Sequence, residues 1–90
     1  MTTVEIYTKS WCGFCRMAKA ILIDENITFE EIDVTFDNDK ELEMIERSGR
    51  RTVPQIFINN EPIGGYTDLM QLSSTINLRD LLTGKDEQSE

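Results

Sequence analysis

The sequence predicts an α/β fold in which helices cover a small sheet. Residues 3–8 alternate apolar and polar side chains with a period of two, as a half-buried strand does. Apolar residues then recur at helical spacing over about 13–25, and two apolar segments after residue 52 lie on either side of a short polar turn. Strand and helix signals that alternate within one short chain are typical of a layered α/β domain.

The first helix and the second strand continue this pattern. The helix has apolar residues at i, i+3, i+4, i+7 and i+8, and the members of this stripe are Phe14, Met17, Ala18, Ile21 and Leu22. A polar turn over 24–26 is expected to end the helix. Residues 28–34 contain β-branched and aromatic side chains and predict the second strand, although their alternation is less regular.

A second helix is expected over about 39–48. Asn38, with Glu41 three residues later, resembles a capping box, in which two side chains satisfy free N–H groups at the start of a helix. Leu42 and Ile45 would face the core, and the glycine after residue 48 would end the helix. Basic residues cluster at this end, namely Arg47, Arg50 and Arg51.

A hairpin is expected after residue 52. Residues 53–58 and 62–63 predict two strands. The intervening Asn59-Asn60-Glu61 predicts a tight turn, because asparagine tolerates left-handed backbone conformations. Gly64-Gly65 then forms a break before the last part of the chain.

The last part predicts a short helix after Asp68 and a final helical turn. Their apolar positions are Leu69, Leu72, Ile76, Leu78, Leu81 and Leu82. The polar residues 84–90 are expected to be frayed. Because 90 residues are too few for two cores, we expect one domain over 1–83 and a polar tail over 84–90.

Charge and composition exclude several classes of function. The chain has 17 acidic and 9 basic residues, a formal net charge of -8, which opposes binding to nucleic acid and to membrane surfaces. Its N-terminal residues lack the basic and long apolar stretches of a signal peptide, so we expect a cytoplasmic protein that acts as a monomer. Histidine is absent, which excludes a Cys-His catalytic pair and a closed four-ligand zinc site within one chain.

Two cysteines three residues apart carry the candidate chemistry. Cys12 directly follows the first strand region and is expected at the N-terminus of the first helix, whose dipole would favour the thiolate that attacks a disulfide. Lys9, Arg16 and Arg51 would add positive potential. Since residues i and i+3 of a helix are neighbours, Cys15 is expected to resolve a mixed disulfide by attacking Cys12 from behind.

Two other interpretations of the cysteine pair stay open at this point. Both residues could be ordinary buried side chains, because unpaired cysteine is among the most buried residue types. Two thiolates from each of two chains could instead form a four-sulfur metal site. The place of the pair between a strand and a helix favours redox chemistry over both alternatives.

Three motifs follow one another along the chain. They are Tyr7-Thr8-Lys9-x-x-Cys12-x-x-Cys15, Thr52-Val53-Pro54-Gln55-Ile56-Phe57-Ile58 and Gly64-Gly65-Tyr66-Thr67-Asp68-Leu69. With them the chain resembles the bacterial glutaredoxin family over nearly its whole length. The resemblance implies a thioredoxin-like fold, with a four-stranded mixed sheet flanked by helices and a cis peptide before Pro54. It also implies a glutathione-dependent thiol-disulfide oxidoreductase that reduces protein disulfides and glutathione mixed disulfides.

In this resemblance the two cysteines are catalytic and glutathione is the co-substrate. The residues implied to bind glutathione are Lys9, Phe14, Arg51, Thr52, Val53, Pro54, Gly65, Thr67 and Asp68. Lys9 and Arg51 would meet its glycine carboxylate. Thr67 and Asp68 would hold its γ-glutamyl end, and Phe14 would form a wall. Taken singly each residue has a plainer explanation, such as a turn, a cap or a solvated charge, and their ordered combination favours the binding groove.

Gly13-Phe14 stands where the resembled family most often has Pro-Tyr between the cysteines. Glycine there also resembles a Cys-Gly-Phe-Ser branch, whose members bridge a [2Fe-2S] cluster between two chains with glutathione as a ligand. That alternative would make Cys12 a cluster ligand in a homodimer, whereas Cys15 in place of the serine favours dithiol chemistry. No other metal site is expected. A third interpretation is a thioredoxin-like carrier reduced directly by a reductase, which the implied glutathione-binding residues oppose.

Overall fold

Residues 2–75 are described by the computed structural model, and within them the predicted alternation of strands and helices is confirmed. The elements are β1 (Val4–Thr8), α1 (Gly13–Asp24), β2 (Glu30–Asp33), α2 (Asn38–Ser48), β3 (Gln55–Ile58), β4 (Glu61–Gly64) and α3 (Tyr66–Thr75). The expected final helical turn, the domain boundary at 83 and the tail over 84–90 lie outside the described residues. None of the helices within 2–75 has the length and apolar character needed to cross a membrane.

The four strands form one mixed sheet in the order β2-β1-β3-β4. β1 runs parallel to β2 and antiparallel to β3, and β3 pairs antiparallel with β4. The sheet implied by the resemblance is therefore confirmed. Asn59 and Asn60 form the turn of the hairpin at φ 52° and 70°, the left-handed conformation predicted for them. Since β1 lies inside the sheet, the chain passes from the centre of the fold directly into the loop that carries Cys12.

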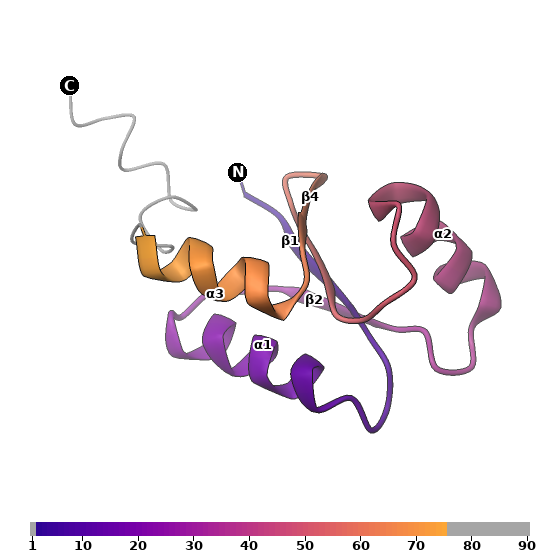
Figure 1. The fold of residues 1–90 in the computed structure, drawn as a ribbon, viewed down its shortest axis with the longest axis horizontal. Helices are drawn as coiled ribbons and strands as arrows, with labels where there is room; N and C mark the ends of the chain where they lie inside the picture. Colours follow the sequence, from indigo (N-terminus) through magenta and orange to yellow (C-terminus); the bar gives the residue numbers. More distant parts are fainter. Residues whose placement is uncertain (1, 76–90) are drawn as a thin grey trace.

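One face of the sheet is covered by α1 and α3, which lie side by side (Figure 1). Ile6, Leu22 and Leu69 are fully buried between these helices and the sheet. The predicted stripe of α1 is buried only in its later part, because Phe14 and Met17 are 59% and 46% exposed. The N-terminal part of α1 therefore leaves apolar side chains at the surface near the thiols.

The opposite face is covered by α2 (Figure 1). Its core is a cluster of buried side chains, which includes Tyr7, Val34, Met44 and Phe57. The prediction that Leu42 faces the core is wrong, since Leu42 is 58% exposed while Met44 is fully buried. Ile45 packs against the cluster, as predicted. The sequence of this helix allows two overlapping apolar stripes, and packing on the sheet selects the stripe that contains Met44.

The N-cap of α2 is Asp37 rather than the predicted Asn38. The Asp37 carboxylate accepts a hydrogen bond from the backbone N–H of Lys40 at 3.0 Å, and α2 begins at Asn38. The third helical residue is Lys40, so the capping box predicted with Glu41 does not form. Aspartate and asparagine are both strong caps, and the local sequence over 37–39 does not decide between them.

A polar network at Arg47 attaches α2 to the sheet. The guanidinium donates to the Tyr7 hydroxyl at 2.7 Å and pairs with the Glu5 carboxylate at 2.8 Å. The Tyr7 hydroxyl donates to Glu43 at 3.0 Å, and the guanidinium carbon lies 4.0 Å from the centroid of the Phe57 ring. Burial raises the pKa of Tyr7, so its hydroxyl keeps the proton that the network uses. Charged and apolar contacts together fix the position of α2.

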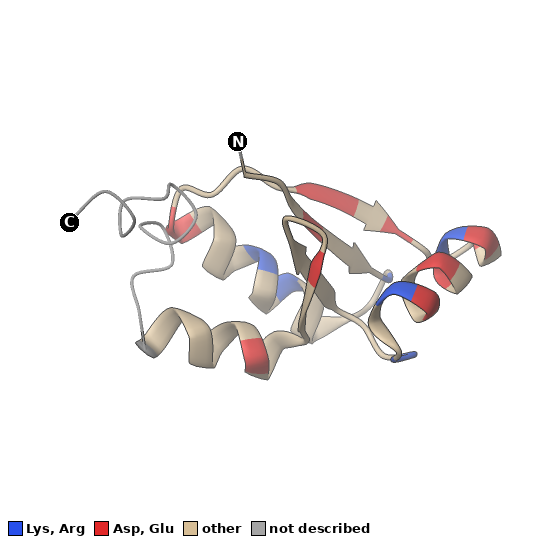
Figure 2. Cartoon of the chain, turned by 90° about the horizontal axis from the view of Figure 1, so that it is seen from above, with Lys and Arg blue, Asp and Glu red and all other residues tan. Residues whose placement is uncertain are grey.

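Acidic residues gather on the outer strand β2 and on α2 (Figure 2). β2 contributes Glu30, Glu31 and Asp33, all of them exposed. Lys19 of α1 neutralises one of these charges, because its ammonium lies 3.0 Å from the Glu31 carboxylate. The side of the molecule from β2 to the start of α2 therefore presents mainly negative charge.

Candidate active site

Cys12 lies at the N-terminus of α1, as predicted, and its own side chain caps the helix. The backbone at Cys12 is extended (φ -96°, ψ 106°), and the sulfur accepts a hydrogen bond from the N–H of Cys15 at 3.1 Å. The sulfur therefore lies at the N-terminal end of the helix with a backbone N–H directed at it. The side chain is only half-buried, so a disulfide in solution can reach it.

Cys15 differs from Cys12 in both access and charge. It lies in the first turn of α1 and is 2% exposed. Burial, followed by the hydrogen bond to the Cys12 sulfur, raises the pKa of the Cys15 thiol to about 12. Cys15 is therefore a protonated, enclosed thiol at neutral pH. This asymmetry is what an attacking and a resolving thiol require.

Cys15 should make the reduced protein lose stability in alkaline solution. Below its ordinary pKa of 9.0 the thiol is protonated in both the folded and the unfolded chain. Between pH 9.0 and about 12 only the unfolded chain releases the proton, so each pH unit should cost up to about 1.4 kcal/mol of unfolding free energy. Cys15→Ala should flatten this loss, while Tyr7 titrates equally in both proteins. Urea unfolding with a phosphine reductant, at about pH 8 and about pH 10.5, measures the difference, and equal slopes would contradict the raised pKa.

The loop before β3 places a cis-proline turn against Cys12. The Val53-Pro54 peptide is cis, which confirms the expectation from the resemblance. The Cys12 thiol donates to the Val53 carbonyl over 3.7 Å, a long contact of the kind that sulfur makes. Gln55 is buried and donates from its side-chain amide to the Thr52 carbonyl at 3.0 Å. This hydrogen bond holds the turn beside the sulfur.

A cavity of about 330 Å³ adjoins the cis-proline turn. Three segments form it: the first turn of α1, the residues around the turn and the start of α3. Its lining residues are Phe14, Arg50, Thr52, Val53, Pro54, Gly65, Tyr66, Thr67 and Asp68. All the residues expected to bind glutathione except Lys9 and Arg51 are thus brought together.

Phe14 and Tyr66 form an aromatic wall of this cavity. Their rings are stacked, with centroids 5.6 Å apart and an interplanar angle of 28°. Phe14 was predicted to form this wall from the resemblance, whereas Tyr66 was not predicted to line the site. The sequence pointed to Tyr66 only through its place within the third motif. Its ring contacts Phe14 because α3 packs beside α1, and this packing cannot be read from the local sequence.

Asp68 organises the side of the cavity formed by α3. Its carboxylate accepts from the Gly65 N–H at 2.9 Å and pairs with Arg50 at 3.2 Å. These contacts, the Gly65 N–H first, lower the pKa of Asp68, which remains a carboxylate. The backbone at Gly64 has φ 119°, which L side chains rarely adopt, and a Cβ there would also collide with this carboxylate, so the position favours glycine. Because α3 begins at Tyr66, Asp68 lies in its first turn and not before it as predicted.

Lys9 and Arg51 are not among the residues that line the cavity. The Lys9 ammonium pairs with Glu41 of α2 at 2.8 Å. Arg50, and not Arg51, extends to the cavity and to Asp68. The basic residues at the end of α2 indicated in the sequence that an arginine would reach the site. They did not indicate whether Arg50 or Arg51 would turn toward the cavity. The glutathione contacts assigned to Lys9 and Arg51 stay predictions.

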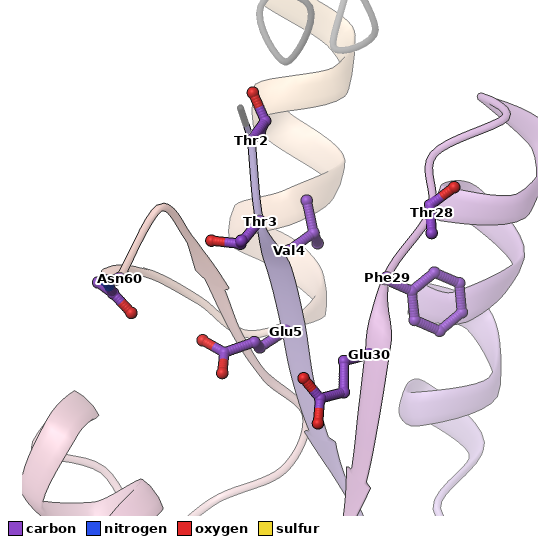
Figure 3. A pocket seen from close by; sticks show the side chains of 8 residues that line it. All are labelled: Thr2, Thr3, Val4, Glu5, Thr28, Phe29, Glu30 and Asn60. Carbon is purple, nitrogen blue, oxygen red and sulfur yellow. The ribbon is translucent and has the colours of Figure 1, made fainter.

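A second cavity, of about 430 Å³, lies at the opposite end of β1 (Figure 3). It is lined by Thr2, Thr3, Val4, Glu5, Thr28, Phe29, Glu30 and Asn60. Glu5 and Glu30 extend to the same side from neighbouring strands, and Glu5 is already paired with Arg47. Neither cavity has a cysteine among its described lining residues, but the Cys12 sulfur lies 3.7 Å from the carbonyl of Val53, which lines the first cavity together with the basic Arg50. We therefore assign the candidate active site to the first cavity.

Comparison of the sequence with known proteins points to one family. The family model described as glutaredoxin matches residues 4–63. Glutaredoxin 3 of Escherichia coli K12 is 48% identical over 82 residues, which cover 91% of this chain and 99% of the relative. Glutaredoxin 1 of Rickettsia felis is 40% identical over 88 residues, which cover 96% of this chain and 86% of the relative.

Comparison of the structure gives the same family. The solution structure of a glutaredoxin from Brucella melitensis has a TM-score of 0.78 and 44% identity, covering 91% of this chain and 89% of the other. The crystal structure of a buckwheat glutaredoxin-glutathione complex has a TM-score of 0.81 and 26% identity, covering 92% and 78%. These structures share the four-stranded mixed sheet and the helices that flank it.

Proposed function

The chain belongs to the glutaredoxin family of thiol-disulfide oxidoreductases, and on that premise we propose that it uses glutathione to reduce glutathione mixed disulfides and protein disulfides. The observation that carries the proposal is the half-exposed Cys12 sulfur, at a helix N-terminus and 3.7 Å from the Val53 carbonyl at the edge of the cavity. The nucleophilic sulfur of Cys12 therefore lies next to a cavity that can hold a tripeptide. The buckwheat relative, whose structure is a complex with glutathione, supports this choice of ligand.

The proposed reaction needs only the Cys12 sulfur when the substrate is a glutathione mixed disulfide. The Cys12 thiolate attacks the glutathione sulfur, so a bond forms between Cys12 and glutathione while the protein thiolate leaves and takes up a proton. The thiolate of a second glutathione then attacks the glutathione held on Cys12. Oxidised glutathione leaves, and the Cys12 thiolate is restored. One mixed disulfide and one glutathione thus become one protein thiol and one oxidised glutathione.

Cys15 enters when the substrate is a protein disulfide. Attack by Cys12 leaves it in a mixed disulfide with the partner protein, and Cys15 then attacks the Cys12 sulfur. The Cys12–Cys15 bond forms, the mixed disulfide breaks, and the leaving partner thiolate takes up the proton that Cys15 loses. Two glutathione thiols subsequently reduce the Cys12–Cys15 bond and leave as oxidised glutathione. The N–H of Cys15 lies 3.1 Å from the Cys12 sulfur, so the two residues are adjacent before the reaction starts.

The cavity offers a matching group for each part of glutathione. The backbone of Val53, beside the cis-proline, pairs with the extended cysteinyl part. The Asp68 carboxylate receives the ammonium of the γ-glutamyl end, while free N–H groups at the start of α3, near Thr67, receive its carboxylate. The stacked rings of Phe14 and Tyr66 cover the apolar side of the ligand.

We assign to Arg50, rather than Arg51, a contact with the γ-glutamyl carboxylate of glutathione, because its guanidinium lies beside Asp68 at that end of the ligand. Arg50 lines the cavity, where its guanidinium is held 3.2 Å from Asp68. Arg50→Gln should raise the KM for glutathione roughly three- to tenfold with kcat little changed, because it removes a contact made equally before and during the reaction. Arg51→Gln is the matched control, since it removes the same charge one residue away, and should change KM by less than about twofold. Steady-state kinetics at varied glutathione concentration measure the KM of each variant. A larger rise in KM for Arg51→Gln than for Arg50→Gln would return the role to Arg51.

The proposed function is tested with a small glutathionyl mixed disulfide coupled to glutathione reductase. The unmodified protein should turn this substrate over at a rate that depends on glutathione. A folded protein that gives no turnover would overturn the proposed reaction for this class of substrate.

A further inference from the structure

Trp11 and Phe36 are the most exposed large apolar side chains within residues 2–75, at 85% and 91%. Single exposed apolar residues are common, but two such rings, one of them adjacent in sequence to the nucleophile Cys12, suggest an interaction site. Trp11 directly precedes Cys12 and has φ 64°, a left-handed conformation that bulky residues seldom adopt. The backbone thus holds a tryptophan in water beside the nucleophile at a conformational cost.

The loops that carry the two rings are joined by hydrogen bonds. The Ser10 N–H donates to the Thr35 hydroxyl at 2.7 Å, and that hydroxyl donates to Asp33 at 2.6 Å. Ser10 and Thr35 each stand immediately before one of the aromatic residues, so this contact brings the Trp11 and Phe36 segments together. Neither ring lines the cavity assigned to glutathione. Both therefore stay accessible when that cavity is filled.

Negative charge adjoins the two rings. Between residues 33 and 43 the chain has five carboxylates and one lysine. Lys40 pairs with Glu43 at 3.2 Å, and Lys9 pairs with Glu41 at 2.8 Å, so the lysines near this surface are neutralised. Asp39 makes no ion pair with any other residue of the described part of the chain. The carboxylates along β2 and α2 (Figure 2) therefore favour a basic partner and repel a second copy of this chain, whose formal charge is -8.

We propose that Trp11, Phe36 and Asp39 mark a docking surface for protein substrates whose glutathionylated cysteine lies among basic and apolar side chains. The inference rests on the proposed function, because it concerns the protein half of the mixed disulfide. With glutathione in the cavity, the protein half extends over the two rings, which bury its apolar side chains. The carboxylates attract its lysines and arginines and speed the encounter. The bonds made and broken are those of the reaction described above.

Three synthetic peptides, each with one cysteine in a disulfide with glutathione, test the docking surface. The first has lysine and leucine beside the cysteine, the second has glutamate in place of lysine, and the third has serine in place of leucine. For the unmodified protein we expect kcat/KM for the first peptide to exceed that for each of the others by roughly tenfold at low salt. The preference for lysine over glutamate should shrink as salt is added.

Substitutions at the surface should remove these preferences selectively. Phe36→Ser and Trp11→Asn should each reduce the preference for the leucine peptide over the serine peptide to about twofold. Asparagine is chosen at position 11 because it tolerates the left-handed backbone there. Asp39→Lys should reduce the lysine preference by a similar factor. Ile23→Ser and Glu61→Lys are matched controls, because both residues are exposed and lie near the ends of their elements remote from Cys12. These controls should keep both preferences.

Each result is expressed as kcat/KM for a peptide divided by kcat/KM for a small glutathionyl disulfide, which separates docking from chemistry. Failure of the unmodified protein on the small disulfide would contradict the proposed function. Normal turnover of the small disulfide with equal ratios for the three peptides would overturn the docking surface alone. Preferences that survive in the surface variants, or that are lost equally in the control variants, would also overturn it.

Discussion

Cys12→Ser should abolish glutathione-dependent turnover, with a loss of roughly a thousandfold or more. A serine hydroxyl is not ionised at neutral pH, and the chain has no histidine that could take its proton. Cys15→Ser should still reduce a small glutathione mixed disulfide, because the proposed steps on that substrate use only the Cys12 sulfur. It should lose most of its activity on a protein disulfide, which needs the resolving thiol. Steady-state rates of both variants on both substrates measure this difference.

The two variants control for each other, since each replaces one sulfur with oxygen within the same turn of α1. Circular dichroism should show that both fold. Turnover that survives in Cys12→Ser and is lost in Cys15→Ser would reverse the assigned roles. Turnover that survives undiminished in both would contradict the assignment of Cys12 as the required nucleophile.

Met44→Ala should lower the free energy of unfolding by about 2–5 kcal/mol. Met44 is fully buried where α2 meets the sheet, in the cluster that contains Tyr7 and Phe57. The truncation removes apolar contacts and leaves a cavity that the fixed backbone of α2 cannot close. Because small domains are stable by only about 5–15 kcal/mol, this loss is large. Urea unfolding followed by circular dichroism measures it.

Leu42→Ala is the matched control for this core prediction. It shortens a side chain of similar size two residues away in the same helix, but Leu42 is 58% exposed. The free energy of unfolding should therefore change by no more than about 0.5 kcal/mol. Equal losses in the two variants would mean that Leu42 also packs in the core, as its sequence pattern predicted.

The order of strands and helices and the place of the thiols could be predicted because they depend on local patterns. The alternation of β1 and the stripe of α1 follow from the periods of a strand and a helix. Local patterns do not decide between equivalent neighbours. Asp37 and Asn38 are both good caps, and Leu42 and Met44 are both apolar. The choice in each pair depends on how α2 packs against strands that are distant in the sequence.

The candidate site shows the same limit. Its three motifs predicted which segments meet around Cys12, and the cavity is formed by those segments. The chain turns at Gly49, where φ is 74°, and only the first of the two following arginines reaches Asp68. The stacking of Phe14 on Tyr66 depends on how α1 and α3 lie against each other. That arrangement is a property of the whole core and leaves no local signal in the sequence.

The two outermost strands bear on how the protein behaves at high concentration. A strand with unpaired N–H and C=O groups is a template on which another chain can add its own strand, a common first step of aggregation. Within residues 2–75, β2 pairs only with β1 and carries carboxylates at Glu30, Glu31 and Asp33. In the same part of the chain β4 pairs only with β3 and includes Pro62, which has no N–H to donate. Both devices discourage edge-to-edge association of the sheets. The molecule can thus keep apolar rings in water beside its sulfur while its strands resist joining those of a neighbour.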